Sequence, residues 1–284
     1  GAEMHAYYLT QWILFFFIYS FIGWVWESCY VSVRKRRWVN RGFLHGPMLP
    51  IYGSGALVIL ISTIGVRENP WLIFLFGMLA ATVLEYITGA VMEKMFHVRY
   101  WDYSRQKLNL NGYICVSSSL CWGVFSVLLV RAVHIPVERA VLDIPLFITD
   151  GAALVLTVIM TVDLTQSFNE AMDLKQVLAQ LEESKEQIGE MQEKLLQLEE
   201  FAERIEVLLK EEIPSKAGSL ISEEKREELK KFRNSIAGEF GRMSSRTDKI
   251  YLHIASQLKR NPTAASKKFA KALEELKDTL ENIK

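Results

Sequence analysis

Three carboxylates lie inside stretches of sequence that are otherwise almost entirely apolar. Glu85 lies well inside the apolar residues 71–94, Glu93 lies near the end of that stretch, and Glu27 belongs to an earlier one, residues 9–33. A charged group in the hydrocarbon of a bilayer costs several kcal/mol, so such a group is expected to face a partner or water. Two interpretations follow: a polar pathway for ions or solutes, or a protonated or paired glutamate that holds neighbouring helices together.

Small residues accompany these carboxylates at helical spacing. Around Glu85 they recur every four residues, at Gly77, Ala81 and Gly89. A similar helical face around Glu27 carries Ser20, Gly23 and Tyr30. Residues at this spacing share one face of a helix, and small ones allow another helix to approach closely. We therefore expect both faces to point toward protein and not toward lipid.

A third feature is the segment 41–55, with the sequence RGFLHGPMLPIYGSG. It has four glycines and two prolines, and proline removes a hydrogen-bond donor and clashes with the preceding helical turn. Broken backbone at membrane depth is tolerated only inside protein or beside a water-filled cavity, and in transporters it often builds the binding site. The candidates for such a site are Arg41, His45, Pro47 and Pro50. The alternative is a loop at the cytoplasmic surface, with a short helix that begins only near Ile51.

The loop at 96–112 mixes aromatic, charged and amide side chains without a helical or strand period. Its candidate site residues are Trp101, Asp102, Asn109 and Asn111. We expect this loop to pack against Arg41 and His45 at the cytoplasmic mouth of a pathway. Asp102 could form an ion pair with Arg41 or with Arg99.

Five stretches are long enough for membrane spans of about 20 residues; they are residues 9–33, 44–65, 71–94, 114–134 and 145–165. Lipid offers the backbone no hydrogen bonds, so the spans must be helical. Basic residues concentrate in the loops after the first and third spans, and such loops stay in the cytoplasm. The sequence thus predicts a multi-pass membrane protein with its N-terminus outside and its C-terminus inside.

The charge balance separates the chain into two parts. The 284 residues contain 33 Lys and Arg against 33 Asp and Glu, so no charge excess favours nucleic acid as a partner. Residues 1–165 hold only 12 basic and 10 acidic side chains, whereas 166–284 hold 21 and 23. This excludes a single soluble globule and predicts a transmembrane domain, 1–165, in the lipid bilayer. The three cysteines have neither disulfide-framework nor zinc spacing, so no metal site is predicted.

The second part has a heptad pattern from Leu174 to Leu209, in which eleven positions alternate by three and four residues and only Ser184 is polar. This pattern predicts a coiled-coil helix, residues 166–213, that could continue directly from the fifth span. A helical hairpin within one chain is the alternative. Residues 214–284 are expected to be a cytoplasmic helical region, interrupted at Asn261-Pro262. The predicted fold class is therefore all-α: five transmembrane helices and a cytoplasmic coiled-coil and helical C-terminal domain.

Several catalytic motifs are absent from the sequence. It has no phosphate-binding G-x-x-x-x-G-K-[ST], no H-E-x-x-H and no G-x-S-x-G. We therefore assign no catalytic residues and no cofactor, and enzymatic activity is the less favoured reading. ATP-driven transport would need a separate ATP-binding subunit.

Several strings together resemble a bacterial family: GWVWE at 23–27, RGFLHGPMLPIYGSG at 41–55, LEYITG at 84–89, VRYWDYS at 98–104 and NLNG at 109–112. The family is Putative ABC-transporter type IV, or CmpB-like permeases, and the resemblance covers about residues 9–165. It implies an integral, multi-pass protein of the bacterial inner membrane that acts as a transporter permease. The motif residues that it carries over are Glu27, Arg41, His45, Pro47, Pro50, Glu85, Trp101, Asp102, Asn109 and Asn111. Five spans are fewer than most ABC permease protomers have, so assembly into a homo-oligomer is expected.

The leading hypothesis is a permease or channel-like subunit whose protomers assemble through the coiled coil. Its polar pathway would use Glu27, Glu85 and Glu93 together with the segment 42–55 and the loop 99–112. A second hypothesis is a membrane enzyme for a lipid-linked substrate, with Arg41, His45 and Asp102 grouped at the cytoplasmic leaflet. A third is a sensor or scaffold protein with tightly packed spans and no polar cavity. The sequence does not indicate the substrate.

Overall fold

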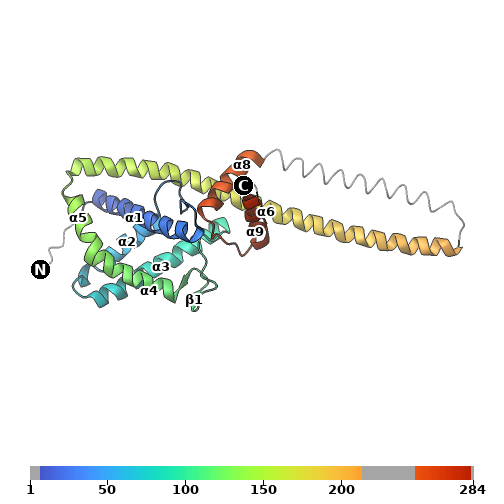
Figure 1. Cartoon of the computed structure of the whole chain (residues 1–284), viewed down its shortest axis with the longest axis horizontal. Coiled ribbons are helices and arrows are strands. Elements are labelled where there is room, and N and C mark those ends of the chain that lie inside the picture. The colour runs from blue at the N-terminus through green and yellow to red at the C-terminus, as the bar shows by residue number, and fades with distance from the viewer. Residues whose placement is uncertain (1–6, 213–246, 283–284) are drawn as a thin grey trace. The chain divides into compact units, whose positions relative to one another are not determined.

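The structure is a computed structural model that describes the backbone of residues 7–212 and 247–282 and most side chains of 7–186 and 253–278. The chain forms two compact units: residues 1–175 together with 254–284, and residues 176–253. Figure 1 shows the helices of the first unit, which contains all the site residues discussed below. The described residues are mostly helical, with one two-stranded sheet.

The first unit begins with three helices of unequal length. Helix α1 (Leu9–Lys35) ends where Arg36 adopts a left-handed conformation with φ of 51°. Helix α2 (Pro50–Ser62) begins with proline in its first turn, where the missing N–H costs nothing, and is followed by a short 3-10 turn, η1 (Ile64–Val66). Helix α3 (Pro70–Phe96) also begins with proline, and the side chain of Asn69 accepts hydrogen bonds from the amides of Trp71 and Leu72.

A loop with a small hairpin connects α3 to the second half of the bundle. Strands β1 (Asn109–Leu110) and β2 (Ile114–Cys115) pair in antiparallel register, with Asn109 opposite Cys115. Helix α4 (Val116–Leu128), the π-helical turn η2 (Leu129–Val133) and helix α5 (His134–Leu142) follow one another without a break. Helix α6 (Leu146–Glu212) is continuous for 67 residues, so the apolar residues 146–165 and the heptad-patterned residues that follow them belong to one helix.

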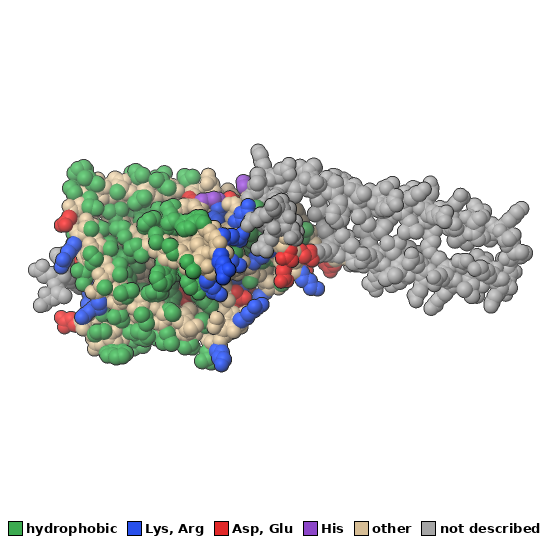
Figure 2. Space-filling model, in the orientation of Figure 1, with side chains coloured by type: hydrophobic (Ala, Val, Ile, Leu, Met, Phe, Trp, Pro, Cys, Tyr) green, Lys and Arg blue, Asp and Glu red, His purple; other side chains and the backbone are tan. Residues whose placement is uncertain are grey.

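Four of these helical segments are long and apolar enough to cross a membrane: Leu9–Lys35, Pro70–Phe96, Val116–Leu142 and Leu146–Glu183. They match four of the five expected spans. The remaining one, expected at 44–65, is the shorter apolar helix Pro50–Ser62. It begins next to Ile51, as the alternative interpretation of this segment predicted, because the glycines and prolines before it do not sustain a helix. Figure 2 shows hydrophobic side chains over the visible face of this unit and charged ones toward its ends.

Helix α2 packs between α1 and α3, and α3 packs against α4. The predicted small-residue face of α3 is buried, since its buried residues include Gly77, Ala81, Glu85 and Gly89. On α1, Ser20 and Gly23 are buried as predicted, but Tyr30 is 54% exposed and accepts a hydrogen bond from Arg34. The buried face of α1 continues through Ser28 and Val31, and Tyr30 lies beside that face and not within it.

The segment 39–49 is not helical and lies along one side of α1. The amides of Val39 and Arg41 donate to the hydroxyl groups of Ser32 (2.9 Å) and Ser28 (3.1 Å). Further along, the amide of Leu49 donates to the carbonyl oxygen of Ser20 (3.0 Å), near the middle of α1. Serines four residues apart on one helical face thus satisfy a backbone that lacks its own helical hydrogen bonds.

The C-terminal part of the chain returns to the first unit. Helix α8 (Thr247–Arg260) ends just before Asn261-Pro262, where the sequence predicted an interruption, and helix α9 (Ala270–Asn282) follows. Between them, Ala265 forms an antiparallel bridge with Arg99, and the hydroxyl of Ser266 donates to the carbonyl oxygen of His97 (2.6 Å). The heptad side chains from 187 to 209 and the helix expected to begin near Ser222 lie outside the described residues.

Candidate functional site

The first unit contains a partly open cavity of about 370 Å³ between its helices. Residues from α1, α2, α3, α4 and α6 line it, together with the segment 41–49, the loop 100–103 and Asn261 from the C-terminal part. Its polar lining includes two carboxylates, Glu27 and Glu85, and one cationic side chain, Arg41. The rest is dominated by aromatic and apolar side chains.

Glu85 is 5% exposed and lies on the buried face of α3. Its carboxylate accepts hydrogen bonds from three neutral groups: the hydroxyls of Tyr103 (3.2 Å) and Ser118 (3.3 Å) and the indole N–H of Trp122 (3.1 Å). Among the described residues no Lys, Arg or His forms a salt bridge with Glu85. When Glu85 is ionised, its charge is therefore solvated by these dipoles and not neutralised by a cationic side chain of the described residues.

The phenol of Tyr103 stays protonated. Burial raises the pKa of the Tyr103 phenol well above its ordinary value, and the nearby Glu85 carboxylate raises that pKa further. A phenol that does not ionise at physiological pH remains a hydrogen-bond donor to Glu85. The contact therefore stabilises a negative charge on Glu85.

Glu27, in contrast, is paired. Its carboxylate lies 3.4 Å from Nε of Arg41 and accepts a hydrogen bond from the Tyr52 hydroxyl (2.7 Å). The same guanidinium donates to the side-chain oxygen of Asn261 (2.8 Å) and to the carbonyl oxygen of Tyr100 (2.9 Å). Arg41 thus joins α1, the loop after α3 and the C-terminal part at one wall of the cavity.

The loop after α3 is organised around Arg99, which is 3% exposed. Its guanidinium contacts Glu93 (2.7 Å) and Asp102 (3.2 Å), so the Asp102–Arg99 pair is present and Asp102–Arg41 is not among the salt bridges. Burial alone would raise the pKa of Asp102, but hydrogen bonds from Ser104 and the charge of Arg99 outweigh it and hold that pKa below its ordinary value. The indole of Trp101 is anchored on the carbonyl oxygen of Tyr113 (3.0 Å) and lines the cavity.

The two asparagines of this loop shape its turn. Asn109 donates to the carbonyl oxygens of Ser104 (3.2 Å) and Gln106 (2.8 Å), and Asn111, at φ of 55°, donates to the Tyr86 hydroxyl (2.9 Å). Gly112 follows at φ of 78°, and a Cβ atom there would lie 2.4 Å from the Arg99 guanidinium. Both asparagines therefore position the loop and do not line the cavity.

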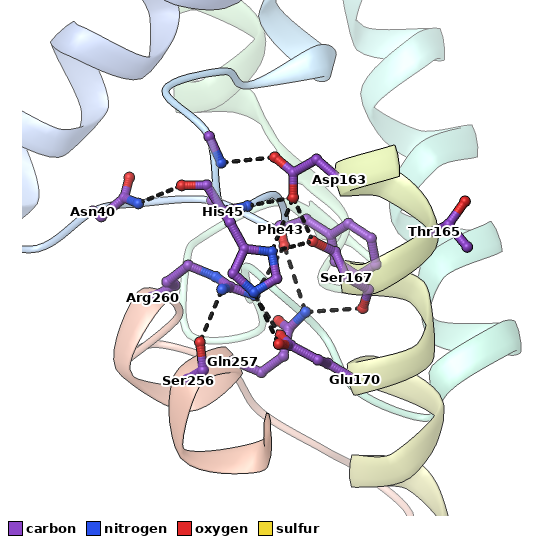
Figure 3. A network of polar contacts seen from close by, with 12 residues as sticks. Asn40, Phe43, His45, Asp163, Thr165, Ser167, Glu170, Ser256, Gln257 and Arg260 are labelled. Carbon is purple, nitrogen blue, oxygen red and sulfur yellow. Dashed lines mark hydrogen bonds and ion pairs between the residues drawn. The ribbon is translucent and has the colours of Figure 1, made fainter. Parts of the chain in front are cut away.

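A second polar cluster, drawn in Figure 3, surrounds His45. Nδ1 of His45 lies 2.9 Å from Asp163, and Nε2 lies 2.8 Å from Glu170; both carboxylates project from α6. Asp163 also accepts hydrogen bonds from the amides of His45 (2.9 Å) and Gly46 (2.7 Å). Glu170 in turn pairs with Arg260 of α8 (2.8 Å). The cluster fastens the irregular segment and α8 to the same face of α6.

The structure brings together five of the eleven residues predicted for the site. Glu27, Arg41, Pro50, Glu85 and Trp101 line the cavity. The other six do not: His45, Glu93, Asp102, Asn109 and Asn111 have the structural contacts described above, and Pro47 is exposed. The loop does reach Arg41, through the carbonyl oxygen of Tyr100 (2.9 Å). The side chain of His45 instead contacts Asp163, Ser167 and Glu170 of α6.

Sequence reasoning missed several residues of these clusters: Asp163, Ser167, Glu170, Gln257, Arg260 and Asn261. Asp163 had a usable signal, because it is an acidic residue near the end of an apolar stretch. The others lie beyond the membrane spans, and nothing in their spacing shows that the chain returns to the first unit.

Arg41, His45 and Asp102 belong to three separate clusters. Arg41 contacts Glu27, His45 contacts Asp163 and Glu170, and Asp102 contacts Arg99. The grouping required of an enzyme for a lipid-linked substrate is therefore not supported by these contacts. A cavity that contains Glu27, Arg41 and Glu85 in an otherwise largely apolar lining also differs from the tightly packed spans expected of a scaffold.

The fold and the cavity define a multi-pass helical membrane protein. The model of the family Putative ABC-transporter type IV matches residues 14–168, more than half of the chain. The protein belongs to this family, which agrees with the resemblance in its motifs, and its apolar helices fit a membrane transport protein. No curated protein and no solved structure matches the chain.

Proposed function

We propose that the protein is a permease or channel-like subunit in which the cavity is part of a polar pathway across the membrane. The observation that carries this proposal is the cavity itself, to whose lining α1, segment 41–49 and α3 contribute Glu27, Arg41 and Glu85. Polar groups at this depth are costly in a membrane, and they are typical of ion and substrate pathways.

Glu85 is the site within this pathway that binds an ion, a proton or a cationic group. Its three neutral donors stabilise the carboxylate without neutralising it, whereas the charge of Glu27 is already paired with Arg41. The irregular segment contributes through Arg41 and Pro50, in the manner of broken helices at the binding sites of transporters.

The end of the bundle with the loop 97–112 and the basic residues 34–37 faces the cytoplasm in this proposal, so that the N-terminus is outside. Asn261 closes part of the cavity wall at that end through its contact with Arg41. Protomers assemble through the heptads of residues 174–209. If ATP drives transport, a separate subunit supplies the nucleotide site, because the sequence has no phosphate-binding loop of its own.

The test is electrogenic and solute flux in proteoliposomes that contain the full-length chain. We expect Glu85→Gln to reduce flux at least tenfold, because the variant keeps the size of the side chain and removes its charge. Glu68→Gln is the matched control, since Glu68 is an exposed glutamate outside the cavity and its substitution is expected to leave flux unchanged.

Size-exclusion profiles of the two variants must match that of the unaltered protein, so that a loss of flux reports on the pathway and not on folding. Equal flux of protons, alkali cations and organic ions in liposomes with Glu85→Gln and with the unaltered protein would disprove the proposed pathway.

A further inference from the structure

The aromatic lining of the cavity shows which kind of ligand it suits. Eight of its twenty lining residues carry aromatic rings; they are Phe43, Tyr52, Phe96, Tyr100, Trp101, Tyr103, Trp122 and Phe168. Aromatic faces attract cations, most strongly where the site is desolvated. An aromatic wall beside a carboxylate combines two features that each favour a positive charge.

The charges of the lining also favour a positively charged ligand. Arg41, the one basic side chain in it, is already engaged by Glu27, Asn261 and the Tyr100 carbonyl. With both glutamates ionised, the lining carries one formal negative charge in excess, located at Glu85. A cation in the cavity would neutralise that excess, while an anion would add to it.

The size and donor set favour an organic cation over a metal ion. A volume of about 370 Å³ lies in the range of small-molecule sites, which run from about 300 to 1,000 Å³. Among the described residues, no three His, Cys, Asp or Glu side chains converge as metal ligands would. Two methionines, Met92 and Met95, add polarizable apolar surface for the body of an organic ligand.

Trp122 connects the aromatic lining of the cavity to its carboxylates. Its indole N–H donates to Glu85 (3.1 Å), and its ring lies 5.7 Å from the ring of Tyr52, centroid to centroid. The hydroxyl of Tyr52 donates to Glu27. Both aromatic side chains are therefore fixed at their polar ends by carboxylates, with their rings on the cavity wall.

From this arrangement we infer that the cavity binds a small organic cation, an amine or quaternary ammonium compound, with its charge beside Glu85 and its apolar part against the aromatic wall. This inference rests on the proposed function, for which it names the substrate class. The binding itself can be measured without transport.

The experiment is calorimetric titration of the full-length protein in lipid nanodiscs, with empty nanodiscs as the blank. The ligands are benzyltrimethylammonium and a matched pair, choline and its neutral analogue in which carbon replaces the quaternary nitrogen. We expect benzyltrimethylammonium to bind, choline to bind at least tenfold more tightly than its neutral analogue, and Glu85→Gln to weaken cation binding at least tenfold. Glu68→Gln is expected to bind as the unaltered protein does.

A second pair of variants tests the aromatic wall without altering any charge. Trp101→Phe and Trp101→Leu both lose the hydrogen bond to Tyr113, and only the first keeps an aromatic ring. We expect several-fold weaker cation binding in Trp101→Leu than in Trp101→Phe. Equal affinity of choline and its neutral analogue, or unchanged cation affinity in a folded Glu85→Gln variant, would overturn the inference.

The two proposals fail in different ways. Cation binding that depends on Glu85, without flux of any solute, would disprove the transport pathway and leave the ligand class standing. Flux that depends on Glu85 but is not inhibited by benzyltrimethylammonium would disprove the ligand class and leave the pathway standing.

Discussion

Replacing Gly77 with alanine tests the close contact between α3 and α4. A Cβ atom at Gly77 would lie 2.2 Å from Oγ and 2.4 Å from Cβ of Ser126, whereas ordinary contacts begin at 3.4 Å. The hydroxyl of Ser126 is held by the carbonyl oxygen of Trp122 (2.7 Å), so the contact is relieved only if the helices separate by about 1 Å.

The expected cost follows from this overlap. Overpacking of a well-packed interface costs about 1–3 kcal/mol. For a domain of this size, each kcal/mol corresponds to about 2–4 °C in melting temperature, so Gly77→Ala is expected to lower the apparent Tm by roughly 2–12 °C. The assay is thermal unfolding of the full-length protein in nanodiscs, followed by tryptophan fluorescence at a fixed scan rate.

Two further variants separate this mechanism from a general effect of the substitution. Gly151 lies in α6 with nothing within 4 Å of its Cβ position, so Gly151→Ala is expected to leave the protein unchanged or stabilise it by about 0.5–1 kcal/mol. Ser126→Gly removes the clashing atoms and is expected to recover most of the loss when combined with Gly77→Ala. An unchanged Tm in Gly77→Ala, or additive effects in the double variant, would refute the reasoning.

Two more predictions concern the loop after α3 and the C-terminal part. Arg260→Ala removes the guanidinium and leaves the buried Glu170 carboxylate with one partner fewer, at a cost of about 3–5 kcal/mol. The backbone amide of Ala265, which bonds to Arg99, should then exchange its hydrogen faster. Lys259→Ala, at an exposed position, is the control, and equal protection of this amide in both variants would contradict the prediction. The pKa of Asp102 is lower in the folded protein than in the unfolded chain. The ionised carboxylate therefore contributes fully to the stability of the fold above the unfolded pKa of about 3.9, and this contribution is lost as the pH falls through the pKa of the folded state. The Asp102→Asn variant should therefore have a lower Tm than the unaltered protein at neutral pH, and the two Tm values should approach each other below about pH 4. A difference in Tm that stays constant over this range would rule out the linkage.

The buried face of α3 could be predicted because it depends only on spacing within one helix. Gly77, Ala81, Glu85 and Gly89 recur every four residues, and the structure buries all four. On α1 the same spacing did not locate the edge of the buried face: Tyr30 is exposed, whereas Ser28 and Val31 beside it are buried. Which residues meet Glu85 could not be read from the sequence, since Tyr103 and Ser118 lie 18 and 33 residues away.

His45 illustrates a different limit. The sequence indicated only that its segment is not an ordinary helix, and it gave no partner nearby. The partners are Asp163 and Glu170, 118 and 125 residues later in the chain. Contacts over such distances depend on how the helices pack, which is decided by the whole unit and not by any local pattern.

The contact between Arg41 and Asn261 also has a consequence for biosynthesis. The two residues are 220 positions apart in the chain. At a translation rate of about 5–20 residues per second, the ribosome reaches Asn261 roughly 10–40 s after Arg41. Helices α2 to α6 are synthesised during that interval, while the wall of the cavity still lacks one of its residues. The nascent protein therefore passes through a stage with an incomplete cavity before the last of its lining residues, Asn261, is synthesised.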